Sequence, residues 1–161
     1  MKKIALLLTS VILFMACEGP QGIPGNDGEI IASSAFEIDI DFTSANEHSF
    51  IENYGFSVYP TDVTLVYMVW ETDNGTEVWR QLPQYREFED GTNLIYNFDF
   101  TQENVRFFLD GTTDFNALGP EWTLNQTFRV VVVPADNVGS LNSNDYNNVI
   151  KTLKITAFDK K

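Results

Sequence analysis

"VTLVYMVWETDNGTEVWRQL" (63–82) is the stretch of sequence that decides the fold. Its first eight residues, 63–70, are apolar on both faces, which is typical of a strand in the middle of a sheet. Asn74-Gly75 follows, and this pair favours the positive φ angles of a tight two-residue turn. The stretch therefore predicts a β-hairpin whose first strand is central.

Strand patterns recur on both sides of this hairpin. "AFEIDIDF" (35–42) alternates apolar and acidic residues, as a half-buried strand does. Further strands are expected at 84–90, 93–100, 104–110 and 127–136, with turn signals at Asp90-Gly91 and Asp110-Gly111 and a stop at Pro134. Short strands separated by such turns predict a β-sandwich or a barrel, and we expect an antiparallel sandwich.

One segment has helical rather than strand spacing. In "NSNDYNNVIKTL" (142–153), Tyr146, Val149, Ile150 and Leu153 follow the i, i+3, i+4, i+7 pattern of a helix face. Asn142 or Ser143 is expected to cap the helix. The fold class is therefore predicted as all-β, a sandwich with one short C-terminal helix near 143–153, followed by a short last strand in the tail.

The first sixteen residues have the pattern of a bacterial signal peptide. Two lysines precede an apolar run that is shorter than the roughly 20 residues of a membrane-spanning helix. A small residue, Ala16, stands directly before Cys17, as in the lipobox of bacterial lipoproteins. Cys17 is the only cysteine, so it has no disulfide partner within the chain. We expect cleavage before Cys17 and acylation of its thiol, with long fatty chains such as palmitate forming the anchor.

Glycine recurs at every third position after this cysteine, at residues 19, 22, 25 and 28. A collagen triple helix needs glycine at this spacing, but about four triplets offer little to offset the ordering of three chains. We expect an extended spacer, and a trimer held mainly by the β-domains remains the alternative. The predicted organisation is a lipoprotein signal peptide (1–16), a lipidated cysteine with a Gly-x-y spacer (17–31) and one β-rich domain (32–161).

The chain is strongly acidic. Its net charge is −13, and it becomes −15 once the leader and its two lysines are removed. Nucleic-acid binding requires clustered Lys and Arg, so nucleic acid is excluded as a partner. The same charge disfavours electrostatic docking onto an anionic bilayer, and membrane association is expected through the lipid anchor alone.

The sequence offers little catalytic or metal-binding chemistry. His48 is the only histidine, it lies in a polar run, and no serine stands in a G-x-S-x-G motif. His and Cys are too few for a zinc site, and the EF-hand-like run from Asp114 to Asn125 lacks the required fifth and twelfth ligands. We therefore predict no catalytic residue, no cofactor and no metal site, although an irregular calcium site among loop acids stays open.

Carboxylates and tryptophans provide the remaining candidates. Paired acids hydrolyse glycosides in many enzymes, and Glu37, Asp39 and Asp41, or Glu87 and Glu89, share strand faces. A solvated sheet face explains these acids more simply. Trp70, Trp79 and Trp122 are candidates for a sugar platform, although Trp70 and Trp79 are expected to pack together or against the core.

Nearly the whole chain resembles a family of short collagen-like lipoproteins of Bacteroidetes. The resemblance lies in "MACEGPQGIPGNDGE" (15–29), in "VYMVWETDNGTEVWRQLPQ" (66–84) and in "TFRVVVVPAD" (127–136). It implies an outer-membrane address and a β-rich domain, and it implies no reaction. We expect a non-catalytic, lipid-anchored envelope protein that binds a protein or glycan or contributes to surface structure, either alone or as an accessory subunit of an outer-membrane assembly. The alternative is a carboxylate-dependent hydrolase acting on glycans.

Overall fold

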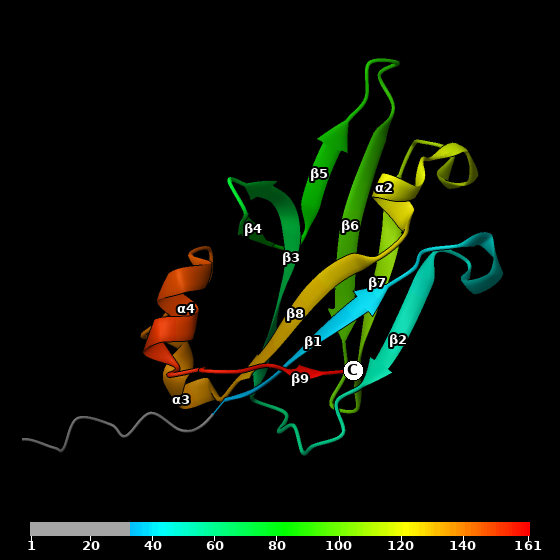
Figure 1. The fold of residues 1–161 in the computed structure, drawn as a ribbon. Coiled ribbons are helices and arrows are strands. Elements are labelled where there is room, and N and C mark those ends of the chain that lie inside the picture. The colour runs from blue at the N-terminus through cyan, green and yellow to red at the C-terminus, as the bar shows by residue number, and fades with distance from the viewer. Residues whose placement is uncertain (1–32) are drawn as a thin grey trace, which may run out of the picture.

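The computed structural model describes residues 33–161, which fold into two packed β-sheets (Figure 1). Cys17 and the Gly-x-y segment lie outside the described residues. The all-β prediction is confirmed, because strands dominate and the described chain contains only one helix longer than about one turn. Within residues 33–161, no helix is both long and apolar enough to cross a membrane.

The first sheet has five strands in the order β4-β3-β8-β1-β9. As predicted, β3 lies inside it, paired with β4 through the Asn74-Gly75 turn and with β8 on its other side. The last strand, β9, pairs with β1 in parallel, whereas the other pairings of this sheet are antiparallel. The strands are β1 (Ser34–Ile40), β3 (Val63–Asp73), β4 (Thr76–Gln81), β8 (Gln126–Val133) and β9 (Asp159–Lys160).

The second sheet has four antiparallel strands in the order β2-β7-β6-β5. Its strands are β2 (Ser49–Asn53), β5 (Gln84–Glu87), β6 (Asn93–Phe100) and β7 (Asn104–Gly111). The sequence pattern did not predict β2, a short edge strand with a weak alternation. Asp110-Gly111 ends β7 rather than forming a hairpin turn, since Gly111 still pairs with Leu94 of β6.

The main core lies between the two sheets and is built by strand alternation. On β1, Phe36, Ile38 and Ile40 are nearly fully buried, as the sequence pattern predicts. Their neighbours on β8 and the inward residues of β6 and β7 complete the same cluster. Two aromatic rings, Phe107 and Phe128, meet across the sheets with centroids 5.0 Å apart.

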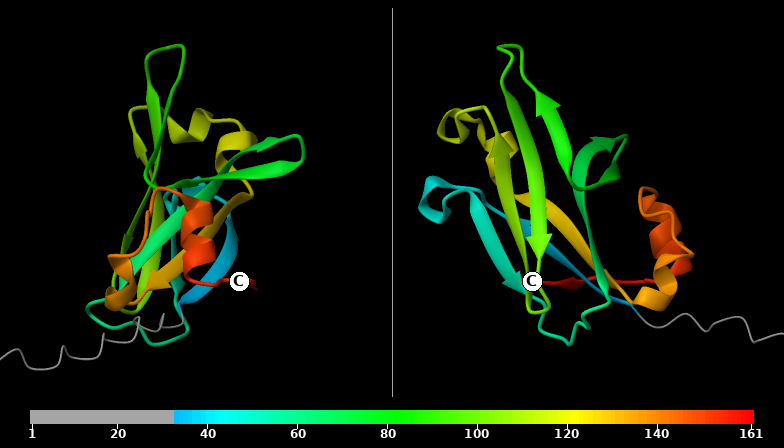
Figure 2. Two further views of the ribbon diagram at one scale, coloured as in Figure 1. Left: turned by 90° about the vertical axis from the view of Figure 1, so that its left-hand side faces the viewer. Right: turned by 180° about the vertical axis from the view of Figure 1, so that it is seen from behind.

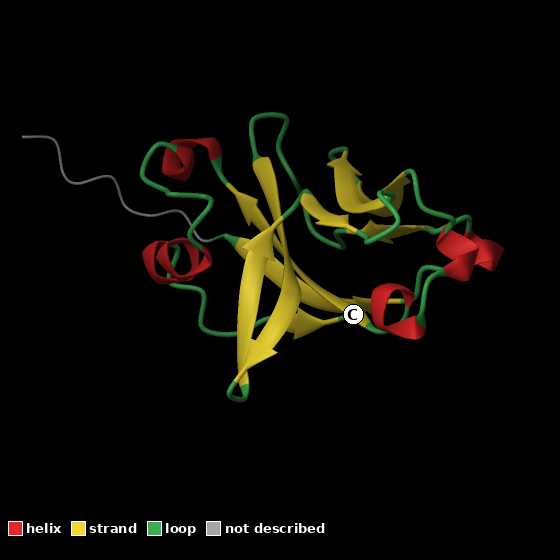
Figure 3. Cartoon of the chain, turned by 90° about the horizontal axis from the view of Figure 1, so that it is seen from above, coloured by secondary structure: helices red, strands yellow, loops and turns green. Residues whose placement is uncertain are grey.

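A second apolar cluster covers the outer face of the five-stranded sheet. Helix α4 (Tyr146–Thr152) buries Val149 there, and α3 (Ala135–Val138) lies beside it (Figures 2 and 3). The Tyr67 hydroxyl donates a 2.7 Å hydrogen bond to the main-chain oxygen of Ser143, which ties the segment before α4 to the sheet. The predicted N-cap was wrong: the cap is Asp145, whose carboxylate accepts from the Asn148 amide.

Four shorter helical segments were not predicted: α3 and also η1 (Ser44–Asn46), η2 (Phe115–Ala117) and α2 (Pro120–Thr123). Of these, α2 matters most for the site, because it connects β7 of one sheet to β8 of the other. It lies at the upper end of the sandwich in Figure 1, and β1 starts at the lower end.

Candidate functional site

The single histidine is a packed surface residue. His48 is half-buried, and its ring lies 5.4 Å from that of Phe115. Its main-chain oxygen accepts a hydrogen bond from the Leu109 amide, 3.1 Å away. These contacts hold His48 in the loop just before β2.

Glu37 differs from the solvated acid that the strand pattern predicts. Its side chain is only 12% exposed and forms ion pairs with Arg129 (2.8 Å) and Lys160 (3.0 Å). Burial raises the pKa of Glu37, but the hydrogen bonds and charges of Lys160 and Arg129 outweigh it and hold the pKa below 4.5. Glu37 is therefore an anion that stabilises the fold.

The other acids with catalytic spacing also have structural or solvated roles. Asp39 accepts a 2.6 Å hydrogen bond from the Thr127 hydroxyl, and Asp41 accepts one of 2.7 Å from the Asn125 amide. Glu87 and Glu89 are exposed on and just after β5.

Metal-binding residues do not gather in the part of the chain that the structure describes. Among residues 33–161, no group of three or more His, Cys, Asp or Glu side chains is arranged to hold a metal ion. Asp114, the first residue of the EF-hand-like run, instead caps η2 by accepting from the Asn116 amide at 3.0 Å.

A β-bulge separates the two tryptophans of the central hairpin. Val69 pairs with Trp79, and Glu71 pairs with Val78, so Trp70 is the extra residue of β3. A bulge redirects the side chain at that position. Trp70 consequently packs against the core between the sheets, whereas Trp79 packs on the outer face and stacks on Tyr146 with ring centroids 5.4 Å apart. Of the two expected arrangements, packing together or packing against the core, the structure shows the second, with each tryptophan on a different cluster.

Trp70 instead shares a cleft with Trp122 of α2. This aromatic cleft has a volume of about 240 Å³ and lies between the two sheets beside α2, the element at the upper end of the sandwich in Figure 1. Both sheets and the α2 connection contribute to its walls. The lining residues are Met68, Val69, Trp70, Glu71, Arg86, Tyr96, Glu121, Trp122 and Gln126.

Each tryptophan of the cleft has an arginine over its ring. The Arg80 guanidinium carbon lies 5.0 Å from the Trp70 ring centroid, and Arg80 also pairs with Glu71 at 3.1 Å. The Arg86 guanidinium carbon lies 5.5 Å from the Trp122 ring centroid. Such cation–π contacts hold the planar guanidinium groups beside the cleft.

A buried tyrosine fixes the position of Trp122. The Tyr96 hydroxyl donates a 2.6 Å hydrogen bond to the main-chain oxygen of Trp122. Burial and the nearby Glu121 carboxylate raise the pKa of Tyr96, so its hydroxyl keeps the proton that it donates. Phe88 also packs edge-on against the Trp122 ring, with centroids 5.4 Å apart.

The sequence pattern pointed to the tryptophans of this cleft but missed its polar residues. Glu71, Arg86, Glu121 and Gln126 come from four different elements or connections, and only tertiary folding brings them together. Arg86 is an exposed residue of β5 that pairs with the buried Leu94, and this register, which only the structure shows, puts it on the inner face of its sheet.

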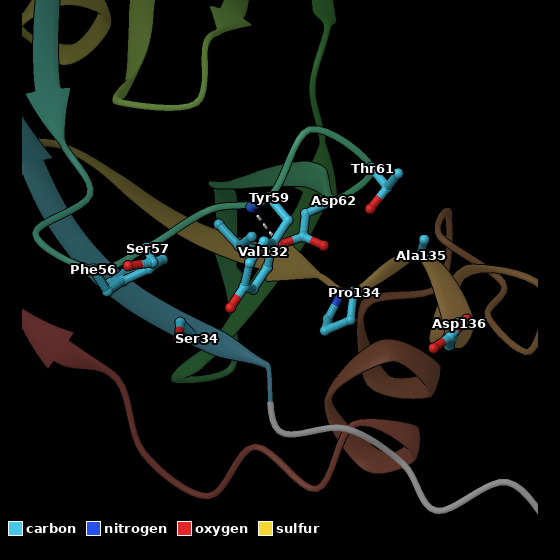
Figure 4. Close-up of a pocket in the computed structure, with 10 residues that line it drawn as sticks. All are labelled: Ser34, Phe56, Ser57, Tyr59, Thr61, Asp62, Val132, Pro134, Ala135 and Asp136. Atoms are coloured by element: carbon cyan, nitrogen blue, oxygen red, sulfur yellow. Dashed lines mark hydrogen bonds between the residues drawn. The ribbon is translucent and has the colours of Figure 1, made fainter.

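A larger basal pocket, about 440 Å³, lies near the start of β1 (Figure 4). Tyr59, which is 68% exposed, and Asp62 come from the β2–β3 loop, and Asp136 comes from α3. The Asp62 carboxylate accepts a 2.9 Å hydrogen bond from the Tyr59 amide, so it helps to hold its own turn. The pocket is acidic and lies at the end of the domain where residues 33 and 34 enter.

Comparisons of this chain with protein-family models, with curated proteins and with solved structures find no match. The function is therefore inferred from the residues themselves.

Proposed function

We propose that this protein is a lipid-anchored protein of the cell envelope whose β-sandwich is a non-catalytic glycan-binding domain. The observation that carries the proposal is the aromatic cleft, in which Trp70 and Trp122 stand beside carboxylate, amide and guanidinium groups. Aromatic rings stack on the apolar faces of sugars, and polar side chains around them fix the hydroxyl groups.

The position of the cleft supports this proposal. β1 starts at Ser34, which lines the basal pocket, and ends at Ile40, which pairs with Gln126 of the aromatic cleft. If Cys17 carries the anchor, the cleft is at the end of the domain away from the attachment. The basal pocket lies at the opposite end, where residues 33 and 34 enter the domain.

The proposed address is the outer membrane, and it rests on sequence features alone. These are the Ala16-Cys17 pair after an apolar leader, the Gly-x-y run, and the resemblance to collagen-like lipoproteins. We propose that the acylated cysteine and the Gly-x-y spacer hold the acidic domain at the membrane, where it acts alone or as an accessory subunit of a larger assembly.

A carboxylate-dependent glycan hydrolase is the second candidate, because Glu71 and Glu121 line the same cleft. Glu71 is already engaged in an ion pair with Arg80 at 3.1 Å. Incubating the purified protein with each glycan that it binds separates the two candidates. We expect binding without release of reducing ends, whereas turnover that is lost in Glu121→Gln would favour the hydrolase.

The binding proposal is tested by titrating envelope and extracellular polysaccharides into detergent-solubilised protein and into a Trp122→Ala variant. We expect the wild type to bind at least one polysaccharide and the variant to lose about tenfold in affinity, which corresponds to about 1.4 kcal/mol. Trp79→Phe is the matched control, because Trp79 lies on the opposite face of the sheet. Failure of the wild type to bind any glycan would contradict the proposal.

A further inference from the structure

Arg86 is the only arginine of the chain without a carboxylate partner in the part that the structure describes. Each of the other three, Arg80, Arg106 and Arg129, forms an ion pair with Glu71, Asp99 or Glu37. Lys151 and Lys154 also form no ion pair within residues 33–161, but they lie outside the aromatic cleft. Arg86 is the unpaired cation that lines the cleft.

The environment of Arg86 holds its guanidinium group ready for a planar anion. Its contact within residues 33–161 is with the Trp122 ring, 5.5 Å from the guanidinium carbon, and no side-chain hydrogen bond engages it there. Stacking on an aromatic face restricts the orientation of the group and leaves its N–H donors available. A guanidinium group binds a carboxylate with two parallel hydrogen bonds, and a lysine in its place would act only as a point charge.

The two acids of the cleft leave room for an anionic ligand. Arg80 pairs with Glu71 at 3.1 Å and offsets its charge. The Glu121 carboxylate lies against the main chain of Gly119, where an added Cβ atom would overlap it. Glu71 is therefore paired, whereas Glu121 forms no ion pair within residues 33–161 and lies against Gly119. Arg86 is the one cation among the residues that line the cleft.

From these contacts we infer that the aromatic cleft binds a carboxylated saccharide, such as a uronic acid unit, with Arg86 pairing its carboxylate. The inference rests on the proposed glycan-binding function and names the class of ligand. Trp70 and Trp122 contact the sugar ring, and Arg86 selects the acidic sugar over its neutral counterpart.

An alternative role for Arg86 is structural. β5 is an edge strand, and an inward-pointing charge on an edge discourages pairing with other sheets. That role predicts no preference between charged and uncharged ligands. Ligand selectivity therefore distinguishes the two roles, whereas stability alone does not.

The test is isothermal titration of detergent-solubilised full-length protein with tetramers of galacturonic, glucuronic and mannuronic acid and with their methyl esters. We expect at least one acidic tetramer to bind about tenfold or more tightly than its ester, and Arg86→Gln to remove this difference between acid and ester. Arg106→Gln is the matched control, because Arg106 also lies over an aromatic ring, that of Phe108, but outside the cleft.

Two results would overturn the inference. If acids and esters bind equally, or if Arg86→Gln keeps the preference, Arg86 does not select the ligand. Binding of neutral glycans that is still lost in Trp122→Ala would then leave the proposed function standing. If no saccharide of either kind binds, the proposed function fails as well.

Discussion

Arg129 and Glu37 form an ion pair across β8 and β1, with Nε of Arg129 2.9 Å from Oε2 of Glu37. The guanidinium carbon also lies 3.9 Å from the ring centroid of Trp79 and 4.4 Å from that of Phe158. The pair therefore joins the five-stranded sheet to the C-terminal segment. Both side chains are largely removed from water. Substituting one of them would therefore leave the other as a buried charge without a counter-ion, which destabilises the fold.

Glu37→Gln should lower the free energy of unfolding by about 2 kcal/mol at neutral pH, since it removes charge-assisted hydrogen bonds. The folded-state pKa of Glu37 lies below its ordinary value of 4.5. The stabilisation is therefore complete above that value and is lost as the pH falls through the folded-state pKa. Urea denaturation from pH 7 to pH 2 should show the difference between wild type and variant shrinking below about pH 4.5. Glu87→Gln, on exposed β5, is the control, and a difference independent of pH would contradict the assignment.

Gly111→Ala should destabilise the domain by about 2 kcal/mol. Gly111 has a φ of +125°, and an added Cβ would lie 2.7 Å from Oδ1 of Asn93 and overlap the Asn93 main-chain oxygen. Gly139→Ala is the matched comparison, because Gly139 has a φ of −66° and no neighbour within 4 Å of the added atom. Thermal unfolding should show a loss only for Gly111→Ala, and equal effects would argue against this β7 geometry.

Cys17→Ala should release the protein from membranes. Ala16-Cys17 at the end of the apolar leader is the basis for this prediction, and it lies outside the described residues. Cell fractionation and incorporation of labelled palmitate are the measurements. A variant that still fractionates with membranes, together with an unlabelled wild type, would rule out the anchor.

Residues 18–161, without lipid, should be a monomer in solution. About four Gly-x-y triplets provide few interchain hydrogen bonds, and as an extended spacer the segment 18–29 would span roughly 35 Å. Light scattering gives the mass directly. A trimer that becomes a monomer when residues 18–29 are deleted would show that the glycines wind into a triple helix.

The local features of the fold were predictable from the sequence. Alternation placed Phe36 and Ile38 in the core, Asn74-Gly75 specified the central hairpin, and helical spacing located α4. Each of these signals depends on neighbours within a few residues. The N-cap of α4 was harder, because Asn142, Ser143 and Asp145 are all suitable cap residues and only the chain path selects Asp145.

The candidate site was less predictable, because it depends on long-range contacts. A one-residue bulge turns Trp70 inward and leaves Trp79 outside, and nothing in the hairpin sequence specifies the bulge. Arg86 lies on β5 and Trp122 lies on α2, which connects the two sheets. The two side chains come into contact only through this tertiary arrangement. The ion-pair partners of Glu37, Arg129 and Lys160, lie on strands far from it in the sequence. The alternating pattern of β1 therefore suggested only a solvated acid at position 37.

The three tryptophans allow the most direct measurement of the central claim, that the aromatic cleft binds glycans. Each indole N–H gives its own NMR signal, and Trp79 serves as an internal control because it stacks on Tyr146 outside the cleft. On titration with the tightest-binding saccharide, we predict that the signals of Trp70 and Trp122 shift in a saturable manner and that the Trp79 signal stays in place. Saturable binding with no shift at Trp70 and Trp122 would contradict the account.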